Sequence, residues 1–213
     1  MVHANHGKIS RRRVVALGLA GATGTLPGWA ADRLVATPRQ GTGPFYPDRL
    51  PDDADNDLVR VAGRQTAALG TVLYVRGRLM DLSGHAIDGA RVEIWQCDSH
   101  STYHHVGDAG RRDPGFQGYG RTRTDADGAY WFRTIRPVPY ASRAPHIHFL
   151  VAAPGFARFS TQMYVAGEAR NQRDWLLKRA GDAAARARLI VPVAPADTVE
   201  AGALAGTFDI VLG

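Results

Sequence analysis

Two histidines separated by one residue could hold a metal ion. His146 and His148 open the apolar, β-prone run at 146–151, which predicts a strand. Because side chains alternate between the two faces of a strand, both imidazoles are expected on the same side. Such a pair can bind one ion without distorting the backbone. The alternative is a structural strand that carries two half-buried histidines.

Two tyrosines and an arginine extend this pattern. Pro137 and Pro139 make the segment before Tyr140 stiff and extended, because proline fixes φ and restricts the residue before it. Arg143 lies on a short loop just before the histidines, and Tyr103 lies in the loop after an earlier strand-like run. These additions favour a site of two tyrosines and two histidines over a core tyrosine beside structural histidines.

The residue types restrict the choice of metal. No carboxylate cluster accompanies the tyrosines and histidines, which argues against Ca²⁺ and Mg²⁺. The single cysteine excludes thiolate zinc and iron–sulfur sites. A hydrolytic zinc site on the same histidines would lack the carboxylate general base that metalloproteases use. A phenol ionises at neutral pH only beside a strong Lewis acid, and Fe(III) is one.

Five short segments occur in the order typical of one known family. They are GPFYP at 43–47, GARVEIWQ at 89–96, TDADGAYWF at 124–132, RAPHIH at 143–148 and TQMY at 161–164. On these segments, within residues 40–213, the chain resembles the intradiol ring-cleavage dioxygenases. This non-haem Fe(III) family includes protocatechuate 3,4-dioxygenase and catechol 1,2-dioxygenase.

The resemblance implies an enzyme that cleaves a catechol-type aromatic diol between its two hydroxylated carbons. It would use O2 and one Fe(III) per chain, and give a cis,cis-muconate-type diacid. The implied metal ligands are Tyr103, Tyr140, His146 and His148. The implied catalytic residues are Tyr140 as a base, Arg143 as partner of the substrate's negative charge, and Gln162 beside it. The implied substrate-binding residues are Pro44, Tyr46 and Tyr164.

Several alternatives stay open at this point. Gln162 and Tyr164 could equally be a strand end with aromatic core packing. The whole chain could be an exported, transthyretin-like β-sandwich that binds a small aromatic without catalysis. Only two residues separate Tyr140 from Arg143, a short spacing that resembles the compact, exported members of the family. The choice of catechol and the formation of a homo-oligomer are open as well.

Residues 1–31 are typical of an export signal. Three arginines at 11–13 resemble a twin-arginine signal, followed by a weakly apolar run and by small residues suited to cleavage. The apolar run is too short for a stable membrane span. We therefore expect export to the periplasm or the extracellular space. The net charge of +6 is partly due to this segment, so nucleic-acid binding is not indicated.

The rest of the chain, 32–213, is the size of one domain and shows mainly β patterns. Turn signals separate the strand-like runs, and the turn at 125–128 predicts a hairpin. This pattern predicts an all-β fold, an antiparallel β-sandwich with a surface helix at 169–188. The predicted strands lie at 71–79, 90–96, 121–124, 129–134, 146–152, 160–165 and 206–212.

Overall fold

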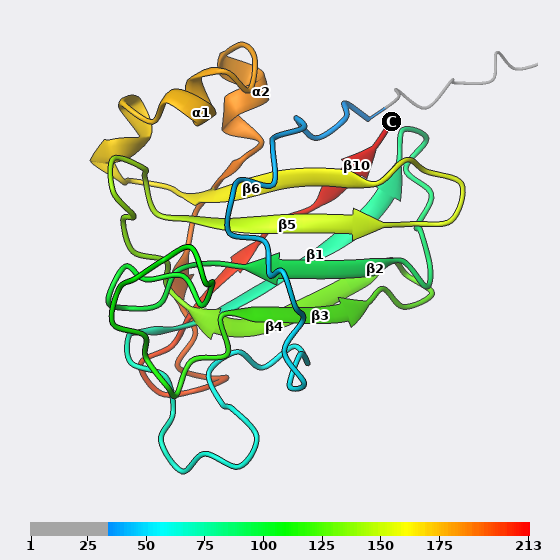
Figure 1. Ribbon diagram of the computed structural model, residues 1–213. Coiled ribbons are helices and arrows are strands. Elements are labelled where there is room, and N and C mark those ends of the chain that lie inside the picture. The colour runs from blue at the N-terminus through cyan, green and yellow to red at the C-terminus, as the bar shows by residue number, and fades with distance from the viewer. Residues whose placement is uncertain (1–33) are drawn as a thin grey trace, which may run out of the picture. The chain divides into compact units, whose positions relative to one another are not determined.

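Two β-sheets face each other in the computed structural model, which describes residues 34–213. The predicted export signal at 1–31 therefore lies outside the described residues. Figure 1 shows β5, β6 and β2 in the front layer, with β1 and β10 behind them. The prediction of a β-sandwich is confirmed.

Each sheet has five strands. The first contains β1 (Val72–Asp81), β4 (Ala129–Ile135), β8 (Ala194–Pro195), β9 (Leu204–Thr207) and β10 (Ile210–Leu212). The second contains β2 (Arg91–Trp95), β3 (Tyr119–Arg123), β5 (His146–Ala152), β6 (Phe159–Val165) and β7 (Ile190–Val191). The sequence predicted antiparallel sheets, but both sheets are mixed. β1 pairs in parallel with β9 and β10, and β6 pairs in parallel with β7.

The predicted hairpin at 125–128 is wrong, although the turn itself forms. The N–H of Gly128 donates to the carbonyl of Asp125 at 2.8 Å, and Gly128 has a φ of +70°. However, β3 pairs with β2 whereas β4 pairs with β1. The turn therefore carries the chain from one sheet to the other, where each strand finds a partner from an earlier part of the chain.

The space between the sheets is filled by the apolar residues that alternate along the strands. Val92 and Ile94 of β2 and Ile147 and Phe149 of β5 are fully buried in one cluster with Phe132 of β4. This inner packing uses every second residue of β5. The remaining residues of that strand, the two histidines included, are directed to the opposite face of the sheet.

The single helix predicted at 169–188 is wrong in detail. Three short pieces replace it: η1 (Ala169–Gln172), α1 (Trp175–Lys178) and α2 (Ala183–Ala187). Asp174 and Asp182 each act as an N-cap, and Gly181 between the two α-helices has a φ of +121° that a continuous helix cannot hold. Within residues 34–213, none of the helices has the length and apolarity that a membrane span requires.

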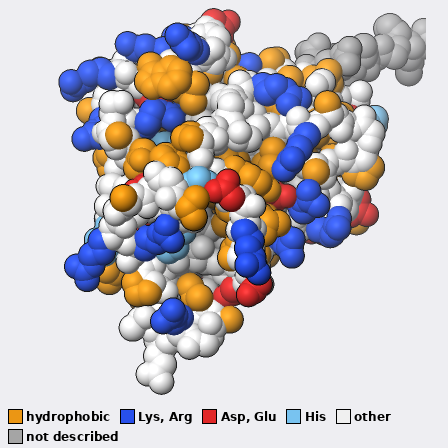
Figure 2. Space-filling view, in the orientation of Figure 1, with side chains coloured by type: hydrophobic (Ala, Val, Ile, Leu, Met, Phe, Trp, Pro, Cys, Tyr) orange, Lys and Arg blue, Asp and Glu red, His pale blue; other side chains and the backbone are white. Residues whose placement is uncertain are grey.

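Residues 34–48, which we call the crossing segment, pass over the outer face of the second sheet. In Figure 1 this blue stretch runs across β6, β5 and β2. The N–H of Gln40 donates to the carbonyl of Ser160 at 2.8 Å, and the Thr161 hydroxyl donates to the carbonyl of Pro38 at 2.7 Å. On the molecular face seen in Figure 2, basic side chains outnumber acidic ones.

Candidate metal centre

The register of β5 brings both histidines to one place. His146 and His148 lie on the outer face of the sheet, and their Nε2 atoms are 3.1 Å apart. Both side chains are almost completely buried, at 2% and 3% exposure. Two unprotonated nitrogens this close in a buried position repel each other unless a proton or a cation lies between them.

The loop after β2 adds a third donor atom. The hydroxyl oxygen of Tyr103 lies 3.1 Å from Nε2 of His146 and 3.1 Å from Nε2 of His148. The three atoms thus form a triangle with equal sides, which we call the donor triangle. Phe45 of the crossing segment stacks on the Tyr103 ring at 4.5 Å. The ring of Tyr103 is therefore covered by a segment more than fifty residues earlier in the chain.

Burial keeps both imidazoles neutral. It lowers the pKa of His146 to about 4, helped by the nearby charge of Arg143, and lowers the pKa of His148 well below its ordinary value. Nδ1 of His146 lies 2.6 Å from the carbonyl oxygen of Ala144, so that nitrogen carries the proton. The lone pair of Nε2 is then directed into the donor triangle, as metal ligation requires.

Tyr140 lies beside the donor triangle but is oriented differently. Its ring is 4.9 Å from the Tyr103 ring, at an interplanar angle of 77°. Within residues 34–213 its hydroxyl makes no hydrogen bond with the three donor atoms. Burial, and then the negative charge of Asp108, raise the pKa of Tyr140. The structure thus brings three of the four predicted ligands into contact and places the ring of the fourth, Tyr140, against the ring of Tyr103.

The predicted arginine and glutamine are in direct contact. Nη2 of Arg143 donates to Oε1 of Gln162 at 2.7 Å and to the hydroxyl of Tyr164 at 2.9 Å. The sheet register explains their position, because Gln162 is opposite His148 and Tyr164 is opposite His146. The arginine, the glutamine and this tyrosine therefore adjoin the histidine pair on one face of the sheet.

The two predicted wall residues of the crossing segment differ in their surroundings. Pro44 is exposed. The hydroxyl of Tyr46 donates to Oε2 of the buried Glu93 at 2.7 Å, and its ring packs edge-on against Trp95 at 5.1 Å. Trp95 in turn stacks on His148 at 4.7 Å. Tyr46 therefore contacts the metal centre indirectly, through this tryptophan.

Three further residues at the site were not singled out from the sequence. Phe45 stands inside the GPFYP segment, and Trp95 is the strand position opposite His148. Asp174 is completely buried and bonds Arg143. Its sequence signal is that of an N-cap, an aspartate before Trp-Leu-Leu-Lys, which predicts a helix start and says nothing about an arginine 31 residues earlier.

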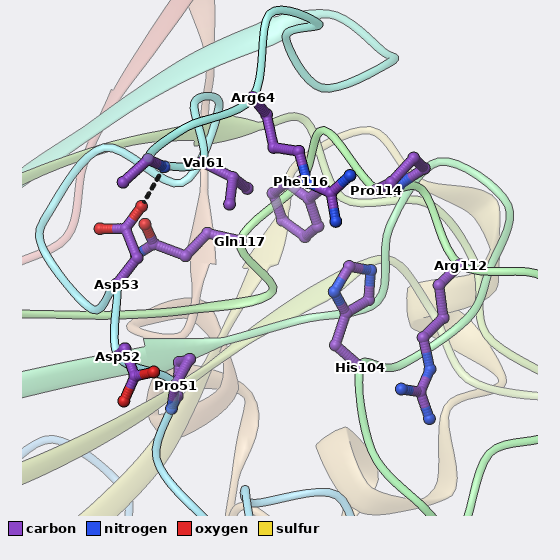
Figure 3. Close-up of a pocket in the computed structure, with 11 residues that line it drawn as sticks. Pro51, Asp52, Asp53, Val61, Arg64, His104, Arg112, Pro114, Phe116 and Gln117 are labelled. Carbon is purple, nitrogen blue, oxygen red and sulfur yellow. Dashed lines mark hydrogen bonds between the residues drawn. The ribbon is translucent and has the colours of Figure 1, made fainter.

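A separate cavity lies behind the loop that carries Tyr103. It has a volume of about 730 Å³, and Figure 3 shows Arg64, Arg112 and His104 around it with Phe116 on its wall. None of the four predicted metal ligands lines it. This cavity is therefore distinct from the candidate metal centre.

Comparison with known proteins gives the family. The family model described as dioxygenase matches residues 41–213. The protocatechuate 3,4-dioxygenase beta chain of Burkholderia cepacia is 38% identical over 168 residues, 74% of this chain and 71% of that protein. A catechol 1,2-dioxygenase of Pseudomonas sp. (strain EST1001) is 28% identical over 75% of this chain. The chain spans only 57% of that relative's length, and 45% of a Corynebacterium glutamicum hydroxyquinol 1,2-dioxygenase.

Solved structures agree with this result. The dioxygenase domain of a dioxygenase and carbohydrate-binding protein fusion from Streptomyces sp. SirexAA-E has a TM-score of 0.64 and 31% identity, covering 84% of this chain and 98% of that one. The catechol 1,2-dioxygenase of Acinetobacter radioresistens, at 21% identity and a TM-score of 0.66, covers 84% of this chain and 63% of that one and shares the fold. The chain belongs to the intradiol ring-cleavage dioxygenases.

Proposed function

We propose that the protein is a non-haem Fe(III) enzyme that cleaves a catechol-type diol between its hydroxylated carbons to give a cis,cis-muconate-type diacid. Both atoms of O2 enter the two new carboxyl groups, so the reaction needs no external reductant. The observation that carries the proposal is the donor triangle, in which the Tyr103 oxygen and both histidine Nε2 atoms are 3.1 Å from one another.

The donor set fits ferric iron. Among residues 34–213, no three His, Cys, Asp or Glu side chains gather as a metal site, so a metal here needs tyrosine oxygen among its ligands. Tyr103, His146 and His148 would hold the ion, with Tyr140 as the fourth ligand. Bound there, Fe(III) would act as a Lewis acid that ionises phenols and activates a bound catecholate towards O2.

The remaining residues of the site handle protons and charge. The catechol must lose two protons, and Tyr140, once ionised as a ligand of the iron, would accept one of them. Arg143 supplies a permanent positive charge opposite the developing negative charge of the substrate. Gln162 and Tyr164 fix the outer nitrogen of that guanidinium, and Phe45 excludes water from the Tyr103 ring.

A reconstitution experiment tests the proposal. Purified protein loaded with iron should absorb in the visible range, through tyrosinate-to-iron charge transfer. It should also consume O2 and form diacid with at least one of catechol, protocatechuate and hydroxyquinol. A colourless protein that takes up no iron, or an iron-loaded protein that turns over none of these diols, would overturn the proposal.

Export is the second part of the proposal. The arginines at 11–13 and the apolar run after them support a twin-arginine-like route to the periplasm or the extracellular space. Cell fractionation tests it by comparing the full chain with a variant that carries lysine at all three positions. The variant should accumulate in the cytoplasm, and equal export of both proteins would count against the route.

A further inference from the structure

The guanidinium of Arg143 is hydrogen-bonded through two of its three nitrogens. Its Nη2 atom contacts Gln162 and Tyr164 on β6, as described above. Its Nε atom donates to Oδ2 of Asp174 at 2.8 Å. Because two different nitrogens of the planar group are bonded, the guanidinium cannot rotate freely about its last bonds, and the orientation of its other N–H groups is fixed.

Asp174 is itself immobilised by the backbone. Its Oδ2 atom also accepts the N–H of Ala144 at 2.8 Å, while Oδ1 accepts the N–H groups of Leu176 at 3.0 Å and Leu177 at 2.9 Å. The residue is completely buried. A buried carboxylate with this many donors has a single orientation, and it can transmit that orientation to the arginine.

The same carboxylate reaches the histidine strand. Ala144, whose N–H it accepts, is also the residue whose carbonyl lies 2.6 Å from Nδ1 of His146. Asp174 thus connects the start of α1, the arginine and the peptide that orients a predicted metal ligand. A helix cap alone would require only the contacts to Leu176 and Leu177.

We propose that Asp174 is a positioning residue for the reaction: its carboxylate sets the orientation of the Arg143 guanidinium towards the bound diol. This inference rests on the proposed function, since Arg143 must face substrate for its orientation to matter. Neutralising Asp174 should therefore weaken diol binding and turnover through Arg143.

The chain offers a matched control for helix capping. Asp182 caps α2 through Oδ1, which accepts the N–H of Ala185 at 2.7 Å, and within residues 34–213 its side chain makes no hydrogen bond to the site. Asp174→Asn and Asp182→Asn both keep a capping oxygen. In Asp174→Asn, however, the amide N–H₂ faces the N–H groups of Arg143 Nε and of Ala144. All of these groups are donors, so the two hydrogen bonds to Oδ2 are lost.

The experiment compares iron-loaded proteins. Catechol is titrated without O2, and the shift of the visible band gives Kd; iron per chain and kcat/KM are measured in parallel. We expect Asp174→Asn to raise Kd about tenfold and to lower kcat/KM at least as much, with iron content close to that of wild type. Asp182→Asn should change neither quantity.

A second background separates positioning from general damage. In Arg143→Met protein, Asp174 has no guanidinium to orient, so Asp174→Asn should change the Kd for catechol less than about twofold. Equal effects in both backgrounds, or equal behaviour of the Asp174 and Asp182 variants, would overturn the inference. If Asp174→Asn does not fold, Asp174→Ser takes its place with the same expected outcomes, since serine caps helices well. Failure of the proposed function would already show in wild type, as absent iron binding or absent turnover.

Discussion

At the scale of single residues, the candidate metal centre holds three hydrogen-bonding atoms with too few protons to satisfy them all. Nε2 of His146, Nε2 of His148 and the Tyr103 oxygen share one small buried volume. The phenol can give its proton to only one of the two nitrogens, and burial disfavours adding another to either. A cation is the simplest way to satisfy all three atoms.

Removing the Tyr103 hydroxyl should therefore abolish the site. We expect Tyr103→Phe to weaken iron binding by at least about 100-fold, because loss of a ligand costs more than loss of the outer partners that orient it. Iron stoichiometry and the visible spectrum measure this. Tyr130→Phe is the control, since Tyr130 is equally buried but donates to the carbonyl of Phe208 in the core. Iron retained in full by Tyr103→Phe would contradict the assignment.

The histidines also predict how stability depends on pH. The folded pKa of His146 is about 4, below the ordinary value of 6.5, so the unfolded chain binds more protons between these values. Stability is then complete above about pH 6.5 and falls as the pH drops towards 4, by on the order of 3 kcal/mol for this group. Urea unfolding of metal-free protein at a series of pH values measures the effect.

A histidine substitution provides the control for this pH dependence. His146→Gln should make the profile between pH 6.5 and 4 less steep without removing the slope, because His148 is also held neutral by burial, whereas His100→Gln, at an exposed position, should leave the profile unchanged. A wild-type profile without any slope in this range would show that the imidazoles are not held neutral.

At the scale of elements, the site depends on loops that meet over a rigid strand. β5 carries the histidines, the loop after β2 carries Tyr103, and the crossing segment places Phe45 on that ring. His105 joins two of these parts, because its Nε2 lies 3.0 Å from Oδ2 of Asp48. The strand fixes two donor atoms by its geometry, whereas the third depends on how these loops pack.

Phe45 is the residue through which the crossing segment should be tested. We expect Phe45→Ala to cost about 1–2 kcal/mol, less than a fully buried phenylalanine, because the side chain is half-buried. The melting temperature should fall by a few degrees, and amide exchange at residues 41–47 should accelerate. Val106→Ala, at an 83% exposed position of the Tyr103 loop, is the control. Unchanged exchange would mean that the segment is held by its backbone bonds alone.

The sequence predicted those parts of the site that depend on local geometry. The histidine pair and the strand at 146–152 follow from alternation along one strand, and the structure has this strand with the same bounds. The crossover between sheets, which takes the place of the expected hairpin, could not be predicted. Both topologies use the same turn at Gly128. The ion pair of Arg143 with Asp174 could not be predicted either, since it depends on where a later helix docks.

At the scale of the whole molecule, the first sheet is packed most tightly where β1 meets the connection between β9 and β10. Gly77 lies in the middle of β1, and a Cβ atom there would be 1.9 Å from the backbone oxygen of Phe208. It would also be 2.8 Å from the Tyr130 hydroxyl. Any side chain at this position must push one strand away from its neighbour.

Gly77→Ala should therefore destabilise the fold strongly. The clash is with the backbone, which cannot rotate aside, so we expect a loss of about 3 kcal/mol and poor soluble yield. Gly41→Ala is the matched control, because a Cβ at Gly41 meets nothing within 4 Å. Thermal unfolding of both variants against wild type decides the matter, and equal melting temperatures would contradict the packing described here.

The charge of the molecular surface predicts a substrate-dependent salt effect. Arg91, Arg121 and Arg123 face outwards on β2 and β3 around a hollow of about 370 Å³, and within residues 34–213 Arg121 and Arg123 have no carboxylate partner. Under the proposed function, the positive electrostatic potential of these arginines should speed the approach of an anionic diol.

The kcat/KM for protocatechuate should therefore fall with ionic strength, and more steeply than the value for neutral catechol. Replacing Arg121 and Arg123 by glutamate should remove most of this salt dependence and leave catechol turnover unchanged. Parallel salt profiles for the two substrates in wild type would refute electrostatic guidance by this surface.

The position of the crossing segment constrains the order in which parts of the chain fold. It is synthesised before every strand it covers, yet its bonds to Ser160 and Thr161 can form only after β6 exists. The earliest part of the described chain therefore takes its place only after β6 has formed, and until then the outer face of β5 lacks this cover. Under the proposed function, a bound ion would then exchange through local opening of this stretch, so the lifetime of the loaded state would follow the rate of that opening.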